Sequence, residues 1–143
     1  MSQYLNFFVR HNEDFIPLAS YSRNTHIYDI AEAPYEKIRR FSQEQLESIA
    51  SRLRESKTFT HKEIARLHQE IEIIKGINIT ADKFDEVLDV IHNITNVISE
   101  YQEDIETLER EAIEIEFMRN MTYDDCEIFA GIEISDPTMD DIG

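Results

Sequence analysis

The sequence predicts an α+β protein in which a long antiparallel helical hairpin, similar to a coiled coil, accompanies a small three-stranded antiparallel sheet. Apolar residues recur every three or four positions over residues 46–74, except across residues 56–60, and again over residues 84–115, where Thr95 occupies one step, as in amphipathic helices. Both ends of the chain are instead typical of strands. The chain has 143 residues but only three Gly and three Pro, which favours long uninterrupted elements. We expect one domain in three parts, residues 1–41, 42–119 and 120–143.

The N-terminal part begins with a predicted β-hairpin. Residues 4–10 are rich in aromatic and β-branched side chains, and the polar residues 11–14 that follow suit a turn. A second apolar run over residues 15–21 supplies the other strand. Pro17 lies within this run and cannot donate a ladder hydrogen bond, so the second strand belongs at a sheet edge or a bulge.

A short helix is expected after the hairpin. Ser22 or Asn24 can cap its start, and Ile27 belongs to its apolar side. The helix should end near Ala33, because Pro34 disfavours helical backbone in the residue before it.

The strongest signal is the first long helix. Ser42 and Gln45 have the spacing of a capping box, in which each side chain bonds the other residue's backbone N–H. Gly76 is the expected stop. The apolar stripe between these two ends consists of Leu46, Ile49, Leu53, Ile64, Leu67, Ile71 and Ile74.

The second long helix should begin at Thr80, which can cap it, and should continue to Arg119. A short link between helices of roughly 50 and 55 Å implies an antiparallel pair. Two helices alone leave much of each stripe exposed to water. We therefore expect the rest to be covered either by a second copy of the chain, in a homodimer, or by the strand segments. The stripe of the second helix consists of Phe84, Leu88, Ile91, Ile98, Tyr101, Ile105, Leu108, Ala112 and Ile115.

The C-terminal part predicts a third strand and a tail. Apolar side chains alternate with others from Cys126 to Ile134, which is the pattern of a half-buried strand. This strand should add to the N-terminal hairpin. Residues 135–143 are expected to form a loose acidic tail.

Negative charge is concentrated in the second half of the chain. The net charge is −16, and residues 80–143 hold 19 acidic and three basic side chains, whereas residues 1–79 hold 11 of each. We expect the acidic side chains of the second helix to face solvent, and we select eight of them as the candidate partner-binding residues. This acidic stretch consists of Glu100, Glu103, Asp104, Glu106, Glu109, Glu111, Glu114 and Glu116.

The acidic stretch has two interpretations. It can be an ordinary solvated helix face, or it can dock on a basic surface that normally holds nucleic acid. Residues 80–117 contain twelve Asp and Glu residues, which give one carboxylate per roughly 4.6 Å along a helix of about 55 Å. Duplex DNA, in comparison, carries one charge per about 1.7 Å. Mimicry of DNA therefore requires two copies side by side, or a partial mimic that blocks one groove.

Catalytic chemistry finds little support in the sequence. Asp89 and His92 have the spacing of half a di-iron motif but no second half, and His61 and His68 have no third ligand at a suitable spacing. Cys126, the only cysteine, is expected in the core, and it favours a reducing compartment such as the cytoplasm. We expect no catalytic residue, metal or cofactor, no direct binding of nucleic acid, and no membrane segment.

A second candidate surface mixes cations with aromatic side chains near the N-terminus. This composition suits stacking on a ligand or binding an anion, and it equally suits tyrosines packed at a sheet edge. Its members are Arg10, Tyr21, Arg23, His26, Tyr28, Tyr35, Lys37, Arg39 and Arg40.

The opening residues 4–10, followed by residues 15–18 and 21–23, resemble the start of small accessory proteins encoded by phages and prophages. This resemblance implies a setting in the host cytoplasm and an anti-defence role of the anti-CRISPR or anti-restriction type. It carries no catalytic motif and assigns no residue.

The functional hypothesis is a non-enzymatic acidic protein that binds and inhibits a basic partner, such as a host nuclease or a CRISPR effector. Two alternatives remain open. One is a structural or assembly-chaperone protein that self-associates through the helices. The other is a protein that sequesters a nucleotide with the tyrosine and arginine residues.

Overall fold

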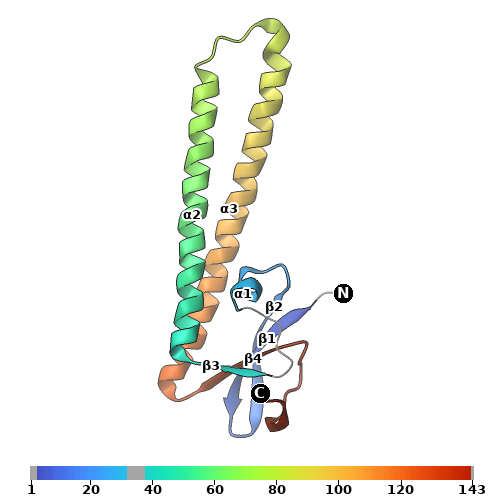
Figure 1. The fold of residues 1–143 in the computed structure, drawn as a ribbon, viewed down its shortest axis with the longest axis vertical. Helices are drawn as coiled ribbons and strands as arrows, with labels where there is room; N and C mark the ends of the chain where they lie inside the picture. Colours follow the sequence, from blue (N-terminus) through green and yellow to red (C-terminus); the bar gives the residue numbers. More distant parts are fainter. Residues whose placement is uncertain (1–2, 32–37, 143) are drawn as a thin grey trace. The chain divides into compact units, whose positions relative to one another are not determined.

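A computed structural model describes residues 3–31 and 38–142, and the chain divides into two compact units. Residues 1–54 and 110–143 form what we call the sheet unit, and residues 55–109 form the two-helix unit. The division falls inside two long helices, α2 (Gln43–Lys75) and α3 (Phe84–Met121), each of which contributes to both units (Figure 1).

The sheet is antiparallel and has four strands, not the three that we predicted. The strands are β1 (Tyr4–His11), β2 (Asp14–Ser22), β3 (Arg39–Phe41) and β4 (Glu127–Ile132), in the order β2-β1-β4-β3. The chain is therefore α+β, as predicted, and β4 adds to the N-terminal hairpin by pairing with β1. Sequence reasoning missed β3, because three residues that include two arginines show no apolar alternation.

The N-terminal hairpin confirms the predicted turn and the predicted place of Pro17. A two-residue loop joins β1 to β2, and Asn12 in this loop adopts a φ of 57°. The register shifts between Phe7 and Phe8, and Pro17 pairs with Phe8 at this bulge. Since β2 is also an edge strand, both conditions that accommodate a proline are met.

The short helix α1 (His26–Ile30) begins later than expected. Its cap is Thr25, whose hydroxyl accepts a 3.3 Å hydrogen bond from the N–H of Tyr28. Ser22 is not the cap, because it is still part of β2, and Asn24 is not the cap either. The predicted end near Ala33 and the role of Pro34 lie outside the described residues.

The predicted ends of the long helices are confirmed at two of four places. The Ser42 hydroxyl accepts from the N–H of Gln45 at 3.1 Å, and the Gln45 side chain accepts from the N–H of Ser42 at 2.8 Å, which completes the capping box. Helix α2 ends immediately before Gly76. Thr80 instead precedes a short 3₁₀ turn, η1 (Ala81–Lys83), and its side chain makes no capping hydrogen bond, so α3 begins only at Phe84. The end of α3, at Met121, lies two residues beyond the expected Arg119.

Aromatic side chains fill both faces of the sheet. Phe7 packs against Tyr21 and Phe41 on one face, with ring centroids 5.6 and 5.5 Å apart. Phe15 packs against Phe129 on the opposite face at 5.4 Å. Phe129 is only 2% exposed, so β4 is buried on both faces and the prediction of a half-buried strand was wrong.

The C-terminal segment is docked on the sheet unit rather than loose. The N–H of Ile38 donates a 2.9 Å hydrogen bond to the carbonyl of Asp141, and Ile38 also forms a parallel bridge with Ile142. Thr138 and Asp141 form a capping box around a 3₁₀ turn, η3 (Met139–Asp141). These bonds hold residues that sequence composition alone assigned to a tail.

Within the described ranges, no helix combines the length and the hydropathy that a crossing of the bilayer requires.

Candidate functional site

The acidic stretch is divided between the two units. Glu100, Glu103, Asp104, Glu106 and Glu109 belong to the two-helix unit. The other three members belong to the sheet unit, namely Glu111, Glu114 and Glu116.

The three members in the sheet unit are bonded within that unit. Glu114 accepts a 2.9 Å hydrogen bond from the phenol of Tyr21, and Glu116 forms an ion pair with Arg54. Burial of Tyr21, and then its bond to Glu114, raise the pKa of Tyr21 well above its ordinary value. The bonds of Glu114 and Glu116 therefore stabilise the sheet unit and leave these two carboxylates less available to a partner.

Glu111 is buried, with only 1% of its surface exposed, so the expectation that it faces solvent was wrong. One carboxylate oxygen accepts a 3.2 Å hydrogen bond from the N–H of Ile27, and the other has no hydrogen-bond partner among the described residues. Burial raises the pKa of Glu111, an effect that the bond from Ile27 opposes. The sequence did contain a signal, because Leu108, Glu111, Ile115 and Met118 have helical spacings of three, four and three.

In the two-helix unit, four members of the acidic stretch are exposed, and the fifth, Asp104, is half-buried. Glu100, Glu103 and Glu106 form no ion pair with any described residue, whereas Glu109 lies 3.6 Å from the Nζ of Lys57. The unit as a whole contains thirteen acidic and five basic side chains. Residues 80–109 account for its entire excess of eight negative charges, since the acidic and basic residues of 55–79 balance.

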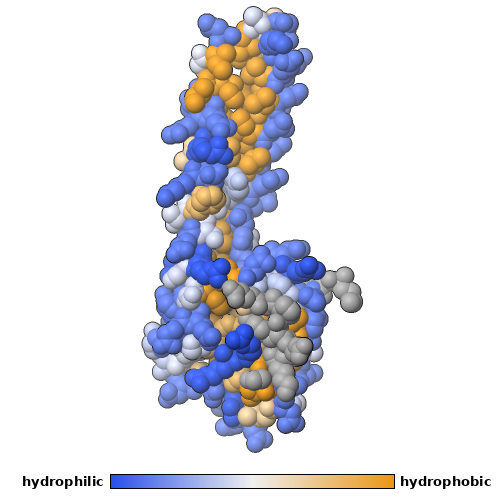
Figure 2. Space-filling view, viewed as in Figure 1, coloured by the Kyte–Doolittle hydropathy of each residue, from blue (hydrophilic) through white to orange (hydrophobic). Residues whose placement is uncertain are grey.

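The same unit carries an uncovered apolar surface. None of the side chains of residues 68–97 is buried, although twelve of them are large and apolar. Figure 2 shows apolar side chains gathered where α2 and α3 approach their connection. The most exposed members of this apolar surface are Ile73 at 67%, Ile77 at 56%, Phe84 at 53%, Val90 at 47% and Ile79 at 39%.

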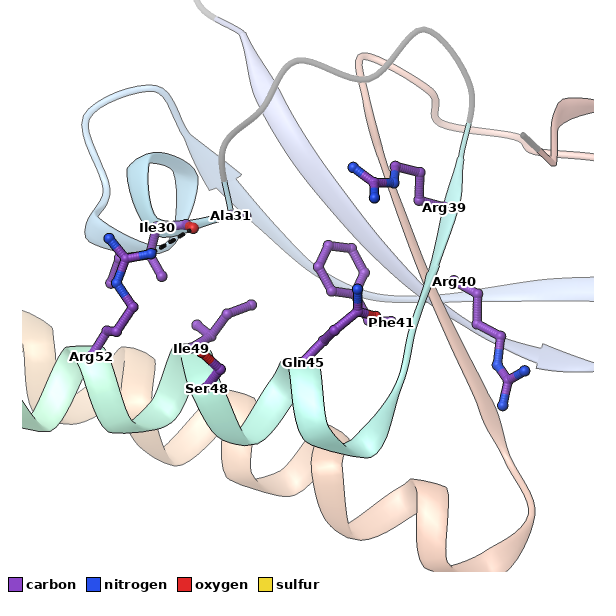
Figure 3. Close-up of a pocket in the computed structure, with 9 residues that line it drawn as sticks. All are labelled: Ile30, Ala31, Arg39, Arg40, Phe41, Gln45, Ser48, Ile49 and Arg52. Carbon is purple, nitrogen blue, oxygen red and sulfur yellow. Dashed lines mark hydrogen bonds between the residues drawn. The ribbon is translucent and has the colours of Figure 1, made fainter.

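The tyrosine and arginine residues of the N-terminal region do not form one surface. Tyr21 and Tyr28 are buried and hydrogen-bonded, so their rings are not available for stacking. Arg10 and Arg40 both approach the carboxylate of Glu127, at 3.6 and 3.8 Å. Tyr35 and Lys37 lie outside the described residues. Arg39 lines a cavity between β3, α1 and the start of α2 (Figure 3).

No group of three or more His, Cys, Asp or Glu side chains is arranged to hold a metal ion in the described part of the chain. Cys126 lies immediately before β4 and is half-buried, so the expectation that it lies in the core was wrong. No protein-family model, curated protein or solved structure matches this chain.

Proposed function

We propose that this chain is a non-catalytic interaction protein that holds a basic protein partner on its two-helix unit. The observation that carries the proposal is the run of residues 68–97, in which none of the twelve large apolar side chains is buried and six are exposed. Contiguous apolar surface of this kind is uncommon on monomeric proteins and marks interaction sites. Burial of one such side chain by a partner stabilises a complex by roughly 1.5–3 kcal/mol before the costs of association.

The architecture that we propose for this unit is an antiparallel, coiled-coil-like hairpin with an open seam. Leu67 and Ile98 are buried, whereas Ile74 and Ile91, further along the same stripes, are only half-buried. The Lys57 to Glu109 ion pair links the two helices further from their connection. A helix or an apolar ridge of the partner would complete the seam near the connection.

The charge of the unit favours a basic partner. Arg66 is neutralised by Glu63 and Glu70 within α2, at 3.0 and 2.6 Å. The exposed carboxylates of Glu100, Glu103 and Glu106 on α3 have no such neutralising partner in the described ranges 3–31 and 38–142. Complementary charge raises association rates and excludes acidic competitors, while the apolar surface supplies most of the affinity.

The phage-like opening sequence directs the search for this partner to host nucleases and CRISPR effectors, which bind nucleic acid through basic surfaces. The lone Cys126 favours the cytoplasm as the place of capture. We do not extend the proposal to DNA mimicry. Glu109, Glu111, Glu114 and Glu116 are bonded within the chain. The other eight of the twelve carboxylates in residues 80–117 give about one per 7 Å, against one per about 1.7 Å in duplex DNA.

The test is capture from host lysate by the tagged full-length chain, with matched variants. One variant replaces Glu100, Glu103 and Glu106 by Lys. Its control makes the same change of charge on three exposed acids of the sheet unit, listed here as Glu13, Asp136 and Asp140. A third variant replaces Ile77 and Phe84 by Ser.

We expect the wild type and the control to capture the same protein, which elutes as salt rises because screening shortens the Debye length to about 3 Å at 1 M. The charge-reversed variant and the Ser variant should each lose it. If the charge-reversed variant captures the protein as well as the wild type does, then Glu100, Glu103 and Glu106 do not contribute to binding. If the Ser variant captures the protein as well as the wild type does, then the apolar surface is not the binding site.

Self-association is the second candidate, and the same uncovered apolar surface favours it. Salt separates the two candidates, because two copies bring like charge together. Screening should therefore strengthen a homodimer and weaken a complex with a basic partner. Light scattering of the purified chain at about 0.05 and 0.5 M salt distinguishes them.

A further inference from the structure

Helix α3 carries two apolar stripes within the two-helix unit, and only one of them is covered. The first is the stripe that the sequence predicts, and its members Ile98 and Ile105 are buried. The second stripe also recurs in steps of three and four residues, which is the heptad spacing of helices that pack together. None of its members is buried, and two of them are exposed. The second stripe consists of Val87, Val90, Ile94, Val97 and Tyr101, the last of which belongs to both stripes.

One end of the second stripe lies close to α2. Tyr101 is near enough to Arg66 of α2 for an electrostatic interaction. Ile73 follows Arg66 by seven residues, so it lies on the same face of α2, where it is exposed. Arg66 itself is neutralised by Glu63 and Glu70 and would not repel a cation. A helix that packs on the second stripe would therefore also meet an apolar side chain of α2.

A row of polar side chains borders the second stripe on α3. Glu86, Asn93 and Glu100 each precede a member of the stripe by one residue, and they recur every seven residues along one edge. Both glutamates are exposed. Glu86 lies 3.5 Å from the Nζ of Lys83, and Glu100 has no ion pair with any residue of the described ranges. Residues 84–109 contain eight acidic residues and no Lys or Arg, so this edge is complementary to a basic side chain.

We propose that the second stripe binds a basic amphipathic helix of the partner. The stripe extends over about 21 Å, which corresponds to about four turns of a helix. The bound helix supplies apolar side chains at heptad spacing to the stripe, and Lys or Arg side chains along one flank to Glu86 and Glu100. The inference rests on the proposed function, which it narrows from any basic protein to one that presents such a helix.

Other occupants fit this face less well. An extended segment presents its side chains with a period of two residues, which does not match steps of three and four. A second copy of the chain would bring together two units that each carry an excess of eight negative charges. The like charges of two such units oppose association, whereas a basic helix neutralises them.

The test is fluorescence anisotropy of the full-length chain with labelled synthetic peptides of about four helical turns. The probe has Leu at the a and d positions of the heptad and Lys at most others. One comparison peptide has Glu in place of Lys, and the other contains the residues of the probe in a shuffled order without heptad spacing. We expect the probe to bind at least tenfold more tightly than either comparison peptide, and circular dichroism to show that it gains helix on binding.

The apolar part of the face is tested with a pair of substitutions. Val90→Ser combined with Val97→Ser should weaken binding of the probe at least tenfold. The matched control is Ile113→Ser combined with Phe117→Ser, which changes two exposed side chains of α3 in the sheet unit and should alter the affinity less than twofold. Circular dichroism shows whether each variant folds. If the Val90 and Val97 variant does not, substitution of both residues by Ala, the best helix former, replaces it and should also weaken binding.

The charged edge is tested in the same way. Glu86→Gln combined with Glu100→Gln should weaken binding of the probe at least fivefold at low salt, because it removes the charge that meets the Lys side chains. The control combines Glu13→Gln with Asp140→Asn at exposed positions of the sheet unit and should alter the affinity less than twofold.

Several results would overturn the inference. These are no binding of the probe, equal binding of the shuffled or the acidic peptide, and wild-type affinity in the Val90 and Val97 variant. A dimer of the chain that the same variant dissociates would identify a second copy as the occupant instead. Capture of a host protein that the probe does not displace would overturn the helical occupant and leave the proposed function standing. Binding of the probe without capture of any host protein would support the helix-binding face and count against the proposed host partner.

Discussion

The backbone N–H of Ile27 donates a hydrogen bond of 3.2 Å to the carboxylate of Glu111, which lies 84 residues further along the chain. The bond links the first turn of α1 to α3 within the sheet unit. It satisfies one oxygen of a buried carboxylate and leaves the other without a partner among the described residues. A buried charge with incomplete hydrogen bonding is costly, so this contact positions α1 at an expense of stability.

Glu111→Gln should stabilise the protein at neutral and alkaline pH. The folded-state pKa of Glu111 is raised above its unfolded value, mainly by burial. Its contribution to stability is therefore fully present below the unfolded pKa, about 4.3, and is lost as pH rises through the folded pKa. The Gln side chain does not ionise and keeps an acceptor for Ile27, so we expect a gain of about 1–3 kcal/mol at pH 8 and little difference at pH 4.

Urea denaturation of both proteins between pH 4 and pH 8 measures this effect. Glu106→Gln, at an exposed position, is the control and should leave the pH dependence unchanged. A Glu111→Gln variant that is less stable than the wild type at pH 8 would contradict the explanation.

Glu47 should contribute to stability with the opposite pH dependence. The hydrogen bond from Arg119 lowers the pKa of Glu47 below its ordinary value. The contribution is present above the unfolded pKa of Glu47 and is lost as pH falls through the folded pKa. Thermal unfolding should therefore show that a Glu47→Gln variant, in which Arg119 is unchanged, loses less stability below pH 4 than the wild type does. Because Glu47 is exposed, 0.5 M salt should make the difference smaller, and a difference that grows with salt would argue against this pairing.

Tyr21→Phe should destabilise the sheet unit by about 1–2 kcal/mol, because it removes a half-buried hydrogen bond to the carboxylate of Glu114. A double-mutant cycle with Glu114→Gln isolates the interaction, and we expect a coupling free energy of about 1 kcal/mol. The control cycle combines Tyr21→Phe with Glu106→Gln in the other unit and should be additive. Equal coupling in both cycles would show that the Tyr21 effect does not depend on this bond.

Gly131→Ala should cost about 1–3 kcal/mol through overpacking. A Cβ added at Gly131 would lie 2.8 Å from the Cγ2 of Ile38 and 3.0 Å from the Cδ1 of Ile134, and the N–H of Ile38 is held by the C-terminal segment. Gly76→Ala is the matched control, since its nearest neighbour would be the carbonyl oxygen of Ile73 at an ordinary 3.5 Å. Thermal unfolding should show a lower midpoint only for Gly131→Ala, and equal midpoints for the two variants would refute the steric argument.

Ser42→Ala should lower stability by about 1 kcal/mol, because it leaves the N–H of Gln45 at the start of α2 without its side-chain partner. Ser99→Ala, at an exposed position inside α3, is the control and should change stability little or increase it slightly. Chemical denaturation measures both variants. A loss at Ser99 as large as that at Ser42 would mean that capping does not explain the result.

Local interactions could be read from the sequence because their partners lie a few residues apart. The Ser42 and Gln45 capping box, the stop at Gly76 and the hairpin with Pro17 at an edge each depend on a single turn or a pair of adjacent strands. The amphipathic stripes also follow directly from the helical repeat. For the same reason, the exposed carboxylates Glu100, Glu103 and Glu106 could be placed on the solvent side of α3 in advance.

Other features depend on segments that are distant in the chain. Strand β3 exists because β4 offers an edge to Arg39–Phe41, and the C-terminal residues are held because Ile38 bonds to Asp141. Neither short segment has a pattern of its own that would predict these bonds.

The sequence by itself determined the α+β class, the two long helices with their apolar stripes, and the concentration of negative charge after residue 80, because periodicity and composition are local quantities. Only the tertiary structure decided that Glu111 is buried against α1 and that Arg39 and Arg52 line one cavity. It also decided that the apolar side chains of residues 68–97 are at most half-buried in their own unit. Burial and the meeting of charges depend on which elements pack together, and residues far apart in the chain carry no local record of that choice.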